Sequence, residues 1–359
     1  MEDVLRIVIT SGTNWKELHE NILRQYDPVL HTKIWLDFST ESWFSIDNQK
    51  INETVYEFIH NTIQNTELDW NLFTFIHGNV YTQYNYSKWR EIFKVEEEIK
   101  VAYYPLWHKM TAEMHLDYSY QNEKLKDHIR PYLYSNLNGA PRDHRVKTQF
   151  YCTKEDLLKH SRHTFYWDDI TLPYTEYTLD WRKWPKLTEA NKHRAIDSHK
   201  IQEPEFYKVF DDTYFDFITE TLTTNERFTI ELEKYVTNPP TPEYKQFFNE
   251  FKTIFITEKL WRSIFYKRPF IVMGNHRTLE YLKVLGFKTF DCMWSEEYDT
   301  IESPNLREDA CLELLKDICN TNTLETMHKK VYSEEVQLIL QHNYDLFKSL
   351  AEDINLIDF

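Results

Sequence analysis

A polar triplet, Thr257-Glu258-Lys259, has the residue types and spacing best suited to chemistry in this sequence. It precedes apolar residues at helical spacing, so we expect Thr257 to cap a helix whose free N–H groups and dipole attract anions. Lys259 adds a positive charge at the end of the helix where the dipole disfavours one, and this suits a phosphate group. Glu258 can accept hydrogen bonds from two hydroxyl groups, as a ribose requires. The triplet therefore predicts a nucleotide-diphosphate site.

The elements around the triplet predict how it is positioned. Apolar spacing predicts a helix over residues 260–265, and Pro269–Met273 has the composition of a buried strand. A second helix is predicted over Thr278–Leu285 and a further strand over Phe287–Phe290. Gly274 ends the first strand, where the backbone either approaches a ligand or simply turns. The alternation of helices and strands favours a parallel α/β sheet.

This stretch resembles the donor-binding half of nucleotide-sugar glycosyltransferases of the GT-B fold. It is most similar to the α1,3-fucosyltransferase superfamily and its viral and bacteriophage relatives. The residues that match in order are Phe255, Thr257, Glu258, Lys259, Pro269 and Gly274. The segments that resemble the phage-type relatives are Leu279–Leu282, Gly286–Phe290 and Glu296–Asp299, followed by Arg307.

The resemblance implies an α/β protein with two Rossmann-like domains, a cleft between them and C-terminal helices. Residues 1–125 would bind the acceptor, residues 126–320 the nucleotide sugar, and residues 321–359 would form helices that often cross back to the first domain. The implied reaction is transfer of a sugar from a nucleotide-diphosphate sugar to a hydroxyl group, with inversion and without a metal. The acceptor would be a glycan or a hydroxymethylated DNA base. The alternative is a non-catalytic descendant that binds a glycan or a protein.

Two arginines are candidates for the donor diphosphate. The predicted strand Tyr132–Leu137 is followed by a turn that resembles one in the phage-type relatives, and a helix is predicted from about Pro141. Arg142 and Arg145 are three residues apart, so they would share a face of that helix, and their planar guanidinium groups suit a diphosphate. The alternative is an exposed helix in which Asp143 pairs with these arginines.

Two further residues belong to the predicted donor site. Glu220 ends the predicted strand Tyr214–Thr221, and the resemblance implies that it faces the donor sugar. Asn275, directly after Gly274, is included among the donor-binding residues.

The candidates for the catalytic base lie in the first domain. Transfer with inversion needs a base that removes the proton of the acceptor hydroxyl. Asp37 ends the predicted strand Lys33–Phe38, and His77 ends the predicted strand Leu72–Ile76. Both are candidates by position only, and a structural role, such as a hydrogen bond within a loop, is the favoured alternative for each.

Length, charge and cysteine content narrow the protein's class. The 359 residues suggest two domains, and the net charge of −16 disfavours a general nucleic-acid binder, although a local basic cleft would permit a DNA acceptor. The four cysteines include no CxxC pair, which predicts reduced thiols in a cytoplasmic protein. The N-terminal residues do not form a signal peptide, and no apolar run is long enough for a membrane span.

The sequence predicts no metal site and no cofactor other than the nucleotide sugar as co-substrate. No aspartate-x-aspartate pair stands at a strand end, and His144, His160 and His163 lack a set of partner ligands. An aromatic and charged insertion over residues 165–205 would either contribute to acceptor specificity or shield a sheet edge.

Overall fold

The structure is a computed structural model. It describes residues 4–9, 17–39, 54–114, 125–138, 142–164, 195–196, 208–221, 223 and 241–353. The predicted insertion over 165–205 lies outside the described residues except for one short strand, β7. The chain is an α/β protein with two sheets, and every strand pair in both sheets is parallel.

The chain forms two compact units. The first comprises Met1–Lys109, Thr224–Phe255 and Ile354–Phe359, and the second comprises Met110–Thr223 and Ile256–Asp353. The units therefore differ from the continuous ranges predicted from the sequence. Helix α9 (Pro242–Glu250) belongs to the first unit because Tyr244 and Phe247 join its apolar core. The C-terminal helices, for which the sequence predicted a separate range over residues 321–359, belong to the second unit up to Asp353.

The first unit contains a four-stranded sheet. In spatial order its strands are β1 (Val4–Val8), β2 (Lys33–Phe38), β3 (Phe73–His77) and β4 (Lys100–Tyr103). Its helices are α1 (Leu18–Gln25), α2 (Val55–Thr66), α3 (Thr82–Phe93) and α9, with the short 3-10 turn η2 at Trp70–Leu72. Helix α4 (Leu106–Met114) spans the boundary between the units.

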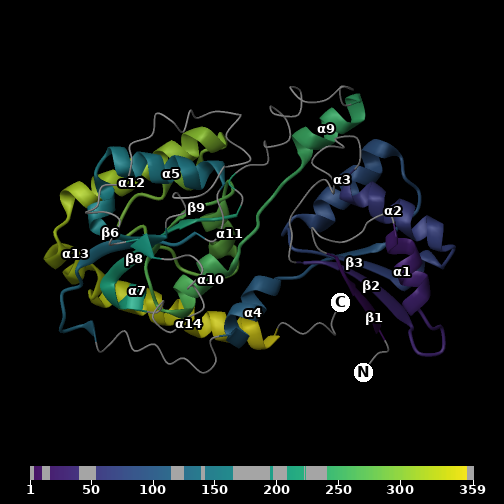
Figure 1. Cartoon of the computed structure of the whole chain (residues 1–359), viewed down its shortest axis with the longest axis horizontal. Helices are drawn as coiled ribbons and strands as arrows, with labels where there is room; N and C mark the ends of the chain where they lie inside the picture. The colour runs from purple at the N-terminus through teal and green to yellow at the C-terminus, as the bar shows by residue number, and fades with distance from the viewer. Residues whose placement is uncertain are drawn as a thin grey trace. The chain divides into compact units, whose positions relative to one another are not determined.

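Hydrophobic alternation explains the packing of this sheet. Leu5 and Ile7 point into the core formed with α1, α2, α3 and α9, while Arg6 points to the other face. Figure 1 shows these helices gathered on one side of the sheet. The spatial order of the described strands equals their sequence order, so the sheet lacks the reversal that creates a ligand-binding crevice in doubly wound folds.

The second unit contains a five-stranded sheet with the spatial order β7-β6-β5-β8-β9. The strands are β5 (Tyr132–Asn136), β6 (Ser161–Thr164), β7 (Ala195–Ile196), β8 (Thr213–Thr219) and β9 (Phe270–Met273). Numbered within the unit, this order is 3-2-1-4-5, which is the order of a doubly wound sheet with a switch point between its first and fourth strands.

Helices cover both faces of this second sheet. Figure 1 shows α5 (Asp143–Lys154) and α12 (Pro304–Thr321) on one face, and α7 (Lys208–Asp212), α10 (Glu258–Phe265) and α14 (Glu334–Asp353) on the other. The remaining elements are α11 (Thr278–Val284), α13 (Leu324–Val331) and the 3-10 turns η4 (Leu157–His160) and η9 (Glu297–Thr300). Within the described part of the chain, no helix combines the length and apolar character needed to cross a bilayer.

One predicted strand, Phe287–Phe290, is wrong. The segment runs beside α14 without joining the sheet, so β9 is the last described strand at this edge. The side chain of Asn343 replaces a strand partner, because its Oδ1 accepts from Lys288 N at 2.8 Å and its Nδ2 donates to Lys288 O at 2.8 Å. A side-chain amide thus satisfies both backbone groups that a strand would have paired.

This replacement gives a testable expectation. Asn343→Ala should lower the free energy of unfolding by about 1–3 kcal/mol, because it leaves the polar backbone groups of Lys288 without their partner. Chemical denaturation followed by circular dichroism measures the change. The control is Gln341→Ala on the same helix, where the exposed amide meets Lys267 at the surface. An equal effect of the two substitutions would contradict the assigned role of Asn343.

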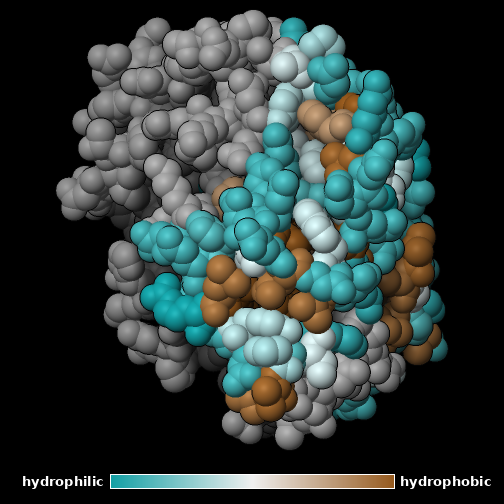
Figure 2. Space-filling model, turned by 90° about the vertical axis from the view of Figure 1, so that its right-hand side faces the viewer, coloured by the Kyte–Doolittle hydropathy of each residue, from teal (hydrophilic) through white to brown (hydrophobic). Residues whose placement is uncertain are grey.

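The first unit exposes several large apolar side chains: Val8, Leu23, Val29 and Leu30. Figure 2 shows apolar residues on one face of the molecule, interrupted by hydrophilic ones. All four cysteines are free thiols, and only Cys292 is exposed. None of these features belongs to the segment around Thr257.

Candidate functional site

Three of the residues predicted to bind the donor, Arg145, Glu220 and Lys259, lie where β5 and β8 end. The chain leaves β5 through α5 on one face of the sheet and enters β9 through α10 on the other. This divergence makes the carboxyl ends of β5 and β8 a switch point, where ligands of doubly wound folds bind. Arg145 in the first turn of α5, Glu220 directly after β8, and Lys259 in the first turn of α10 all lie at this edge.

Thr257 caps α10 as the sequence predicts, since its Oγ1 accepts from Lys259 N at 3.4 Å. Glu220 in turn holds Thr257. Its carboxylate accepts from Thr257 N at 3.1 Å and from Thr257 Oγ1 at 2.6 Å. Glu220 is buried, so both hydrogen bonds to Thr257 lie away from solvent. It therefore fixes the start of α10 to the end of β8.

Lys259 is buried within this cluster. Its Nζ lies 3.1 Å from Thr257 Oγ1 and 3.1 Å from Glu258 Oε1. Burial lowers the pKa of Lys259, and Arg145 acts in the same direction, while the charges of Glu258 and Glu220 oppose the shift. A cation is thus held in a poorly solvated place, where it interacts strongly with any anion that reaches it.

The two carboxylates of the cluster differ in environment. Burial raises the pKa of Glu220, although Lys259 and the hydrogen bond from Thr257 oppose the rise. Burial also acts to raise the pKa of Glu258, but Lys259 and Arg262 outweigh it, so the net pKa is lowered. The Glu258 side chain is 39 % exposed, which leaves carboxylate surface available to a ligand.

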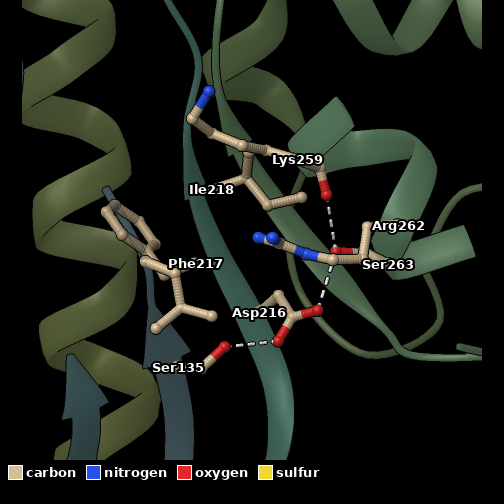
Figure 3. Close-up of a pocket in the computed structure, with 8 residues that line it drawn as sticks. Ser135, Asp216, Phe217, Ile218, Lys259, Arg262 and Ser263 are labelled. Carbon is tan, nitrogen blue, oxygen red and sulfur yellow. Dashed lines mark hydrogen bonds between the residues drawn. The ribbon is translucent and has the colours of Figure 1, made fainter. Parts of the chain in front are cut away.

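A pocket lies beside Lys259. The residues that line it are Ser135, Leu137, Asp216, Phe217, Ile218, Lys259, Arg262 and Ser263. Figure 3 shows the guanidinium group of Arg262 extending toward β8 between Lys259 and Asp216. The enclosed space is only about 10 Å³, roughly what one water molecule needs, so a group as large as phosphate has to lie at the open side of the pocket.

The floor of the pocket is a buried network around Asp216. Its carboxylate accepts from Ser135 Oγ at 2.5 Å, from Ser263 Oγ at 2.7 Å and from Arg268 Nε at 2.9 Å. Arg268 also donates to the carbonyl groups of Phe210 and Thr213. This ion pair joins residues 52 positions apart, and no sequence pattern indicates it. Asp216 thereby ties the middle of β8 to α10.

Sequence reasoning also missed Arg262. It lies three residues after Lys259, so both side chains emerge from the same face of α10 and line the same pocket. That spacing is visible in the sequence and could have identified Arg262 once the helix was predicted. Two basic residues of one helix thus line the pocket, and Figure 3 shows the guanidinium group of Arg262 inside it while the ammonium group of Lys259 points away from Asp216.

The prediction that Arg142 and Arg145 share a helix face is wrong. Helix α5 begins at Asp143, and Arg142 precedes it as an extended N-cap residue with φ −142° and ψ 154°. Arg145 lies within the helix and is buried, and its Nε donates to Thr219 O at 3.3 Å. Next to it, His144 Nε2 lies 2.7 Å from Glu220 O. Arg145 is therefore brought to the buried side of the cluster.

Asn275 has a local structural contact. It follows β9, is buried, and its carbonyl accepts from Thr278 Oγ1 at 2.7 Å at the start of α11. It is not among the residues that line the described pocket.

The two candidate bases are buried at strand ends in the first unit. Asp37 is 1 % exposed and accepts from Arg6 Nε at 2.6 Å and from Ser39 N at 2.9 Å. His77 is 0 % exposed, and its Nδ1 accepts from Asn79 N at 3.0 Å. These contacts fit the structural alternative for each residue, since a base must reach the acceptor hydroxyl.

Within the described residues, no group of three or more histidine, cysteine, aspartate or glutamate side chains is arranged to hold a metal ion. No protein-family model matches the chain, and no similar protein was found among curated proteins or solved structures. The resemblance to GT-B glycosyltransferases therefore remains a prediction that rests on the residues named above.

Proposed function

We propose that this protein is a glycosyltransferase that moves a sugar from a nucleotide-diphosphate sugar to a hydroxyl acceptor. The observation that carries the proposal is the position of Lys259 and Arg262. Both residues line one pocket at the switch point of a doubly wound sheet, and Lys259 stands in the first turn of the helix beside it. Each of these features attracts phosphate, and together they suit a diphosphate.

The chemistry of sugar transfer uses such a site directly. Breaking the bond between the sugar carbon and the phosphate oxygen leaves the electron pair on the diphosphate, which becomes more negative as the transition state forms. Cations fixed in a poorly solvated place stabilise that developing charge without having to reorganise. Lys259 and Arg262 would contact the diphosphate, and the exposed oxygens of Glu258 would accept hydrogen bonds from the ribose hydroxyl groups.

The rest of the proposal extends the resemblance. The second unit would bind the donor and the first the acceptor, as in a GT-B enzyme, and the reaction would proceed without a metal. The acceptor would be a glycan or a hydroxymethylated DNA base. The catalytic base remains unassigned among the described residues, because Asp37 and His77 are both buried.

That burial also favours a second candidate function. A non-catalytic descendant would keep the phosphate site and lack an accessible base. It would bind a nucleotide, a glycan or a protein partner without chemistry.

A two-step experiment separates these functions. A thermal-shift screen of the full chain against nucleoside diphosphates and nucleotide sugars should identify a stabilising ligand, since a ligand that binds only the folded state raises the melting temperature. The nucleotide sugar so identified is then incubated with candidate acceptors in EDTA, and release of nucleoside diphosphate is measured. Release supports the transferase, and binding without release supports the non-catalytic descendant. No stabilisation by any nucleotide contradicts the transferase and the phosphate site, and leaves only a descendant that binds a glycan or a protein.

A further inference from the structure

The contacts of Glu220 indicate a role different from contact with the donor sugar. Its carboxylate and the ammonium group of Lys259 meet at one atom, Thr257 Oγ1. That oxygen lies 2.6 Å from Glu220 Oε2 and 3.1 Å from Lys259 Nζ. Since Oγ1 donates its single proton to the carboxylate, its lone pairs are oriented to accept from the ammonium group. The three groups form a chain with one favoured direction of hydrogen bonding.

We infer that Glu220 is a positioning residue that holds Thr257 and keeps Lys259 as an ammonium ion, ready to bind phosphate. This inference rests on the proposed function of Lys259. Glu220 acts through Thr257 and does not touch the ligand. Its carboxylate fixes the first turn of α10 to β8, and its negative charge offsets the burial of the lysine.

Other charged groups around Lys259 also affect whether its side chain carries a proton. On α10, Glu258 favours the charged lysine, while Arg262 lines the same pocket as a second cation. On α5, Arg145 disfavours the charged lysine. Burial and Arg145 therefore oppose the ammonium form, and the two carboxylates of Glu258 and Glu220 support it. Removing one carboxylate should shift the balance toward the neutral amine.

The expected result concerns the protonation of Lys259 in Glu220→Gln. Glutamine keeps the shape of the side chain and removes its charge, so Lys259 should lose its proton at a lower pH than in the wild type. The readout is the pH titration of lysine 13Cε resonances in the full chain, with the Lys259 signal assigned by its loss in Lys259→Arg. The control is Glu280→Gln, which removes an exposed carboxylate from α11 in the same unit and should leave the Lys259 titration unchanged. An unchanged titration in Glu220→Gln overturns the inference.

The consequence for binding is measured with inorganic pyrophosphate by calorimetry at pH 7 and pH 9. Relative to the wild type, Glu220→Gln should lose more affinity between the two pH values, because a larger share of Lys259 is then the neutral amine. Glu220→Asp keeps the charge, so it should retain the wild-type pH profile even where its shorter reach weakens binding at both values.

The controls separate the two proposals. If wild-type protein does not bind pyrophosphate, the proposed phosphate site is refuted. The titration of Lys259 in the ligand-free protein still tests the role of Glu220, because it needs no phosphate. Should Glu220→Gln fail to fold, Thr257→Val replaces it, because it removes the hydroxyl group that joins the carboxylate to Nζ. A wild-type titration of Lys259 in Thr257→Val would then overturn the inference.

Discussion

Replacing Lys259 by alanine should weaken nucleoside-diphosphate binding by about 10- to 100-fold, because a charge-assisted hydrogen bond contributes ~1.5–3 kcal/mol. Lys259 Nζ is held at the start of α10 by Thr257 and Glu258, and the residue is one of those that line the pocket. The substitution removes the phosphate-binding cation and keeps the helix cap, because the backbone N–H of residue 259 still donates to Thr257 Oγ1. Isothermal titration calorimetry with the nucleotide found in the screen measures the loss.

The stability of this variant is also part of the prediction. A lysine whose pKa is lowered by folding destabilises the folded state at every pH below that lowered pKa, and the cost disappears only above the unfolded-state value. Lys259→Ala should therefore not lower the melting temperature at neutral pH, and Lys259→Met, which fills more of the space, serves as a second test. The matched control is Lys329→Ala, an exposed lysine on α13. Unchanged nucleotide affinity in Lys259→Ala would refute the phosphate site.

The largest effect on stability is expected from the ion pair under the pocket. Arg268 and Asp216 are both buried, 2.9 Å apart. Arg268→Met should lower the free energy of unfolding by about 3–5 kcal/mol, because it leaves the Asp216 carboxylate as a buried charge without its cation. It also removes the donors to the carbonyl groups of Phe210 and Thr213. Urea denaturation followed by circular dichroism, with the two units fitted as separate transitions, measures the loss.

An exposed pair in the same unit provides the comparison. Arg277 and Glu280 form an ion pair 3.1 Å long on the surface of α11, with both side chains more than half exposed. Arg277→Met should change stability by less than ~1 kcal/mol, since surface pairs contribute little. If Arg268→Met lowers the free energy of unfolding no more than Arg277→Met does, the buried ion pair does not stabilise the unit as predicted.

Local sequence patterns determined the elements. The apolar run of Lys33–Phe38 predicts β2 with the bounds observed, and Thr257 predicts the start of α10. These two predictions are confirmed because both features depend on residues close together in the chain. A buried strand needs a run of apolar residues, and a helix cap needs the few residues that follow it. The segment Phe287–Phe290 has a strand-like composition too, but Asn343, more than 50 residues later, supplies its hydrogen-bond partner. Local composition cannot reveal such a distant partner.

The candidate site was likewise predicted only in part from the sequence. The sequence by itself determined that Thr257, Glu258 and Lys259 start a helix and that a cation stands where the dipole disfavours it. Only the tertiary structure decided that Glu220 binds Thr257, that Asp216 pairs with Arg268, and that the pocket lies at the switch point between β5 and β8. The physical reason is that these contacts join residues distant in sequence through the strand order, and strand order is set by the packing of the whole unit.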